Sequence, residues 1–134
     1  MTNPTPSPCS FYSAGQILLA MRLHMRFTVE RGNPPDVQFS SFARLDNLVA
    51  VLLAGEVVVR MHNPKGASDI IVNYRSRRDF DEANELVRAI HGDWSESEVD
   101  AFLVARRHVV ERLLRGQGDL MFAIAEGVAG KIGK

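Results

Sequence analysis

Hydrophobic side chains recur at intervals of three and four residues in several stretches of the chain, which is the spacing of helices with one buried face. These stretches predict helices at about residues 13–23, 40–55, 76–91, 95–116 and 119–132. Because the last two follow one another directly, the C-terminal third of the chain is expected to be wholly helical.

Residues with known roles at helix ends support some of these boundaries. Ser95 and Glu98 have the spacing of a capping box, and Trp94 is placed to pack on Val99 as a hydrophobic staple. Gly55 is expected to end the second helix, because glycine readily adopts the left-handed conformation that stops a helix. The sequence therefore predicts both a defined start for the fourth helix and a defined end for the second.

Between the second and third helices, two short segments alternate apolar and polar residues, which is the spacing of strands with one buried face. Their apolar positions are Val57, Val59, Met61, Ile70, Val72 and Tyr74. The link at 63–68 contains proline and glycine and is too short for a crossover helix. We therefore expect an antiparallel hairpin at about residues 56–75, with Tyr74 facing the core.

A further strand is predicted near residue 27, because Met25, Phe27 and Val29 alternate with polar residues. One long helix that continues to Arg31 is the alternative. The two prolines at 34–35 then interrupt the chain and predict a loop. The expected fold class is α+β, with a small antiparallel sheet of about three strands packed by several helices. In that sheet the strand near residue 27 would lie beside the second strand of the hairpin.

The chain length of 134 residues is that of a single domain. Residues 1–10 combine three prolines with small polar residues, a composition that buries too little apolar surface to offset the entropy of the chain. We therefore expect a flexible, dispensable tail at 1–10 and one domain at 11–134.

Charge and cysteine content narrow the class of protein. Lys plus Arg and Asp plus Glu both number 16, so no overall field attracts nucleic acid or an anionic membrane. Cys9 is the only cysteine, which excludes a disulfide within the chain and a zinc site built from several thiolates. The apolar run at 17–21 is too short for a membrane span and lacks the preceding positive charges of a secretory signal. We expect a cytoplasmic protein that does not bind membranes.

Residues with catalytic or metal-binding chemistry form no recognisable motif, and no motif is specific to a known family. The four histidines lack the spacing of a zinc site: His24, His62, His91 and His108. No serine stands in a Gly-x-Ser-x-Gly turn, and the acidic residues at 79–85 fit the first turn of a helix. We therefore predict no catalytic residue, no metal and no cofactor, and expect a protein that is not an enzyme.

Basic residues gather on the polar side of the predicted hairpin and just beyond it. They form a candidate set of nucleic-acid contacts: Arg60, Lys65, Arg75, Arg77 and Arg78. Such a surface can bind phosphates. Single-strand binders usually add exposed aromatic side chains, and with Tyr74 assigned to the core this set has none. A nucleic-acid-binding module is therefore the alternative function rather than the first.

The last predicted helix has a broad apolar surface that must be covered. Its candidate interface residues are Leu120, Met121, Ile124, Val128 and Ile132. The helix either folds back on its own domain or packs on a second copy or another protein. The first hypothesis is thus a non-enzymatic binding or regulatory protein that acts through protein contacts and self-associates.

Overall fold

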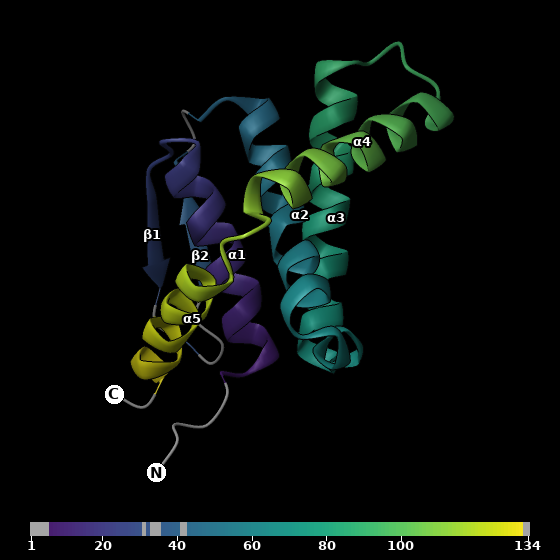
Figure 1. Cartoon of the computed structure of the whole chain (residues 1–134). Coiled ribbons are helices and arrows are strands. Elements are labelled where there is room, and N and C mark those ends of the chain that lie inside the picture. Colours follow the sequence, from purple (N-terminus) through teal and green to yellow (C-terminus); the bar gives the residue numbers. More distant parts are fainter. Residues whose placement is uncertain (1–5, 31, 33–35, 41–42, 133–134) are drawn as a thin grey trace.

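The computed structural model describes residues 6–30, 32, 36–40 and 43–132, with side chains described up to residue 129. Within these residues it is mostly helical, with one small sheet (Figure 1). The elements in chain order are α1 (Pro8–Arg22), β1 (Phe27–Glu30), β2 (Asp36–Phe39), α2 (Leu45–His62), the 3-10 helix η1 (Pro64–Ser68), α3 (Ile70–Ile90), α4 (Glu96–Leu114) and α5 (Gly118–Ile132). The expected α+β class is confirmed in this form.

Helix α1 forms the centre of the molecule. It is buried along nearly its whole length, from Cys9 to Ala20. Helices α2 and α5 pack against it, and further contacts come from β2, α3 and α4 (Figure 1). A helix covered on all sides is expected to be apolar all round, as this one largely is. No helix in the described part of the chain is long and apolar enough to cross a membrane.

Two apolar clusters lie on opposite sides of α2. One joins α2 to α1 and α5 and includes Leu18, Val58 and Met121. The other joins α2 to α3 and α4 and includes Val49 and Leu103. Helix α2 therefore links the two halves of the core, which explains why it is apolar along most of its length.

The sheet has two strands rather than the three expected. β1 pairs with β2 in antiparallel register, with Phe27 opposite Phe39 and Glu30 opposite Asp36. The predicted strand near residue 27 is therefore confirmed, and the long-helix alternative is wrong. Strand β2 falls where a loop was expected, because its polar residues and the preceding prolines hide the strand pattern. Its Val37 is buried against α1 and α5.

The hairpin predicted at 56–75 is wrong, because this segment is helical. Helix α2 continues to His62, η1 follows, and α3 begins at Ile70. The three consecutive valines at 57–59 are all buried, which a strand with one buried face does not allow. Tertiary packing of these side chains overrides their preference for strands.

The prediction that Gly55 ends α2 is wrong, because the helix continues to His62. Gly55 instead allows α1 to lie close to α2. A Cβ atom at position 55 would overlap the aromatic ring of Tyr12. One turn away from Tyr12 on α1, a Cβ at Gly15 would lie 2.7 Å from the Cβ of Val58 and 2.9 Å from the carbonyl oxygen of Ala54. The two glycines thus let α1 and α2 pack closely, with side chains filling the space that each glycine leaves.

Some of the other predicted helix ends are confirmed, whereas α2 begins at Leu45 rather than at about residue 40 and α3 begins at Ile70 rather than at about residue 76. Ser95 and Glu98 form the predicted capping box at the start of α4. Helix α5 begins at Gly118 and ends at Ile132, close to its predicted limits. At the N-terminal end, Ser7 caps α1, so Pro8 to Ser10 belong to the helix and not to the expected tail. Residues 1–5 of that tail lie outside the described residues.

Substitution of Gly55 tests the close contact of α1 with α2. Gly55→Ala is expected to lower the free energy of unfolding by about 2 kcal/mol, because the added methyl group overpacks the Tyr12 ring. Gly127→Ala is the matched control, since no atom lies within 4 Å of its new Cβ. There the higher helix propensity of alanine should raise stability by up to about 1 kcal/mol. Urea denaturation of both variants measures the effects, and equal stabilisation of the two would contradict the packing argument.

Candidate functional site

The basic residues predicted to contact nucleic acid do not share one face. Arg75 is buried, with 3% of its surface exposed. Arg60 and Arg77 border a cavity between α2 and α3, whereas Arg78 borders a different cavity beside β2. Lys65 lies in η1. Because the hairpin on which the set was predicted is absent, the structure brings together at most two of these side chains at a time.

The candidate interface on α5 is mostly occupied within the chain. Met121 and Val128 are buried, and Ile124 is partly buried against the same core. Leu120 is 43% exposed, and the side chain of Ile132 lies outside the described residues. α5 therefore covers α1 with most of its apolar surface, which leaves little of that surface for a second protein.

A different apolar surface is exposed at the start of α3. Ile70 is 85% exposed, Tyr74 68% and Ile71 45%. Residues three and four apart lie side by side on a helix, so these side chains form one surface, here called the α3 patch. Sequence reasoning missed it because Ile70 and Tyr74 were assigned to the buried face of a strand. Asp69 could have signalled the helix start, since its carboxylate caps the backbone of Ile71.

The opposite side of α3 is held in place by a buried arginine. Arg75 Nη1 donates to Ser13 Oγ at 2.9 Å and to the carbonyl oxygen of Cys9 at 3.3 Å. Its guanidinium carbon also lies 4.5 Å from the centre of the Tyr12 ring, within range of a cation–π interaction. Since Arg75 directly follows Tyr74, these contacts with α1 fix the direction in which the α3 patch faces.

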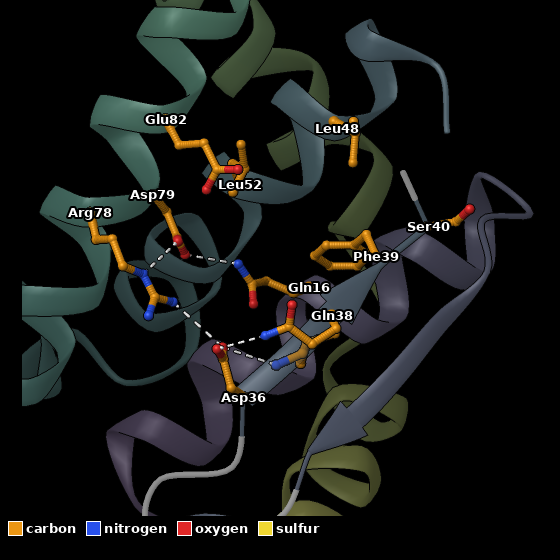
Figure 2. Close-up of a pocket in the computed structure, with 11 residues that line it drawn as sticks. Gln16, Asp36, Gln38, Phe39, Ser40, Leu48, Leu52, Arg78, Asp79 and Glu82 are labelled. Atoms are coloured by element: carbon orange, nitrogen blue, oxygen red, sulfur yellow. Dashed lines mark hydrogen bonds and ion pairs between the residues drawn. The ribbon is translucent and has the colours of Figure 1, made fainter. Parts of the chain in front are cut away.

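Asp79 is the second buried charge on the inner side of α3 (Figure 2). Its carboxylate accepts hydrogen bonds from the Tyr12 hydroxyl at 2.7 Å and the Gln16 amide at 3.0 Å. Arg78 Nε lies 3.4 Å from the other oxygen. Burial raises the pKa of Asp79, and the bonds from Tyr12 and Arg78 offset only part of that rise.

Asp36 connects this network to the sheet. Its carboxylate lies 3.4 Å from Arg78 Nη2, as Figure 2 shows. It also lies 3.8 Å from Arg75 Nη2. The buried Nη2 of Arg75 has no hydrogen-bond partner among the described residues, so its attraction to Asp36 is Coulombic only. Two carboxylates thus neutralise two guanidinium groups where β2, α1 and α3 meet.

A cavity of about 400 Å³ opens beside this network. It lies between β2, α1, α2 and α3, and six of the side chains around it are Gln16, Phe39, Leu48, Leu52, Asp79 and Glu82 (Figure 2). The ring of Phe39 and the two leucines form its apolar side, whereas the amide and the carboxylates form its polar side. We call it the β2–α3 cavity.

The histidines occupy separate places. His91 stacks on Trp94 with ring centres 3.7 Å apart, and His108 lies 4.0 Å from Glu111 on α4. The part of the chain that the structure describes contains no group of three histidine, cysteine or acidic side chains able to hold a metal ion.

Known proteins give no template for this site. Neither protein-family models, nor curated proteins, nor solved structures match the chain. Two features are candidate binding sites. The α3 patch could be buried against the surface of another molecule, and the β2–α3 cavity has room for a small ligand. The network of Tyr12, Arg75 and Asp79 lies between them and holds both in position.

Removal of one hydroxyl group tests the role of this network. Tyr12→Phe is expected to lower the free energy of unfolding by about 1–3 kcal/mol, because Asp79 loses a buried hydrogen bond. The bond favours the ionised carboxylate, so the loss should be larger at neutral pH and shrink as pH falls through the pKa of Asp79. Tyr74→Phe is the control, since Tyr74 is exposed and should change stability by less than about 0.5 kcal/mol. Equal effects of the two substitutions in thermal and urea denaturation would contradict this role.

Proposed function

We propose that this chain is a non-enzymatic binding or regulatory protein that acts by binding another protein through the α3 patch. The observation that supports the proposal is the exposure of Ile70 and Tyr74, which together place an aliphatic and an aromatic side chain in water. Exposed apolar surface of this kind is typical of protein-binding sites. Tyrosine is also among the residues that contribute most to binding energy at protein interfaces.

The patch is rigidly presented, which favours binding. It lies on a helix of 21 residues whose inner side is tied to α1 by Arg75 and Asp79. A surface that is already ordered loses less conformational entropy when a partner covers it. The buried charges under the patch therefore support affinity without touching the partner.

The neighbours of the patch indicate the chemistry of the partner. Arg77 and Arg78 lie one helical turn beyond Tyr74, and Arg77 has no ion pair with any described residue. A partner with an apolar surface edged by carboxylates would match both parts of this arrangement. We therefore infer a different protein as the partner.

Self-association through α5, as the sequence predicts, has less surface available. Met121 and Val128 are used within the chain, so Leu120 and the neighbouring Phe122 are the large exposed side chains of that helix among the described residues. A dimer formed by α5 would leave the α3 patch free. The two modes of association can therefore be separated by substitution.

Paired substitutions on α3 test the proposal. Ile70→Ser combined with Tyr74→Ser should leave the fold intact, because both side chains are exposed, and should weaken binding about 100-fold by removal of two central contacts. Val104→Ser on α4, which is 54% exposed, is the matched control and should leave affinity unchanged. The native chain, the double variant and the Val104→Ser control are each immobilised and exposed to cell extract. A protein that the native chain and the control retain, and the double variant does not, is then purified, and its affinity for each of the three is measured by titration. Equal affinity of that protein for the double variant would overturn the proposal.

Light scattering of the chain without partner completes this test. A monomer is expected for the native chain and for the double variant. A dimer that persists in the double variant would point to α5 as the interface, whereas a dimer lost in the double variant would make a second copy the occupant of the patch.

A second candidate function is nucleic-acid binding, and the exposure of Tyr74 favours it. The sequence predicts this tyrosine in the core, whereas its side chain is 68% exposed and lies one helical turn before Arg77. An exposed aromatic ring beside guanidinium groups can stack on a base while the charges contact phosphates. The adjacent isoleucines fit a protein surface better, so this function ranks second.

Titration with a labelled single-stranded oligonucleotide at low salt tests this candidate. Binding should fall steeply as salt is added, and Tyr74→Ala should weaken it by about 1–3 kcal/mol, the usual value of one stacked base. Val104→Ala is the control and should bind as the native chain does. No binding at about 100 µM protein, the weak end of non-specific affinity, would exclude this function.

A further inference from the structure

We propose that the β2–α3 cavity binds a small organic cation, namely a primary ammonium or guanidinium group carried on an apolar body. This site is separate from the α3 patch, and the proposal does not depend on the proposed protein partner. Its basis is the balance of charge, of hydrogen-bonding groups and of apolar surface around the cavity.

The charges around the cavity leave one carboxylate without a counter-ion. Arg75 and Arg78 are matched by Asp36 and Asp79 through the contacts described above. Glu82 also borders the cavity, and it forms no ion pair with any described residue. The surroundings of the cavity therefore carry an excess of one negative charge, which a monocation would neutralise.

The hydrogen-bonding groups are also unbalanced, with an excess of acceptors. Gln16 donates its amide nitrogen to Asp79, and Gln38 donates its amide nitrogen to Asp36. With their nitrogens used in this way, the two amides keep their oxygens as acceptors, and Figure 2 shows the Gln16 oxygen on the side of the amide away from Asp79. Arg78 carries the one guanidinium among the described residues of the wall, and its Nε and Nη2 are directed at Asp79 and Asp36. A ligand rich in N–H donors fits this wall, whereas an anion would meet mainly acceptors.

The other side of the cavity is apolar. Phe39 presents its ring toward the interior, opposite the polar side chains of α1 and α3 (Figure 2). Leu48 and Leu52 from α2 extend this apolar wall. An aromatic face also attracts a nearby cation. At about 400 Å³ the cavity lies toward the small end of ligand sites, so the apolar body of the ligand must be small.

Titration with simple probes tests this site. 2-Phenylethylamine and phenylguanidine supply the two cationic groups on an aromatic body, 2-phenylethanol is the neutral analogue, and phenylacetate is the anionic one. We expect at least one cation to bind about tenfold or more tightly than the alcohol, because a charge-assisted hydrogen bond replaces a neutral one. Phenylacetate should not bind. Isothermal calorimetry or NMR titration of the 134-residue chain gives these affinities.

Two glutamates on the same helix provide the variant and its control. Glu82→Gln removes the unpaired charge without a change of shape and should weaken binding of the cation about tenfold. Glu85→Gln removes a similar exposed charge one turn away that does not border the cavity, and affinity should stay unchanged. Backbone NMR shifts caused by the ligand should centre on Gln16, Phe39 and Glu82 and leave Ile70 unmoved.

Three results would overturn the proposal. The first is that neither cation binds more tightly than the alcohol. The second is that neither cation binds at about 10 mM, a concentration that detects even ligands weaker than a millimolar dissociation constant. The third is that Glu82→Gln leaves the affinity for the cation unchanged. None of them bears on the protein partner, because Ile70 and Tyr74 do not border this cavity. Likewise, if the α3 patch bound no protein, the affinities expected for the cationic probes would not change.

Discussion

Tyr12 joins the two parts of the molecule on which its surfaces depend. Its ring fills the space that Gly55 leaves on α2, and its hydroxyl donates to the Asp79 carboxylate on α3. The same ring lies against the guanidinium group of Arg75. One fully buried side chain therefore sets both the distance between α1 and α2 and the rotation of α3. The exposure of the α3 patch and the position of the β2–α3 cavity follow from these two constraints.

The sequence predicted the elements whose signals are local. The capping box of Ser95 and Glu98 and the apolar spacing of α5 both depend on residues within one or two helical turns. The error at 56–75 arose where a local preference competed with distant packing. Val58 and Val59 favour strands on their own, but in the folded chain both are buried in the cluster that joins α2 to α1, and the helix is retained. Nothing near position 55 in the sequence reveals that the residue which needs the room there is Tyr12.

The candidate site was harder to predict, because its decisive contacts join residues far apart in the chain. From the sequence alone, Asp79 fits the exposed first turn of a helix and Arg75 fits the polar side of a hairpin. Both residues are expected at the surface, because burial of a charge is costly unless the charge is paired. The structure pairs them with α1 and with Asp36, over separations of more than 60 residues for Tyr12 with Asp79 and for Ser13 with Arg75. The spacing of residues within one helix or strand does not predict contacts with residues so far away in the sequence. The contacts of Arg75 and Asp79 fix the rotation of α3, and at that rotation Tyr74 faces outward.

The central place of α1 also has a consequence during protein synthesis. Helix α1 is made early, whereas α5, which covers much of its apolar surface, can form only after residues 23–117 have left the ribosome. Until then the nascent chain exposes the apolar side of α1 that α5 later covers. Chains with such exposed surface are prone to aggregation and are typical clients of chaperones. The order of the elements along the chain therefore makes α1 the segment that most needs protection before folding is complete.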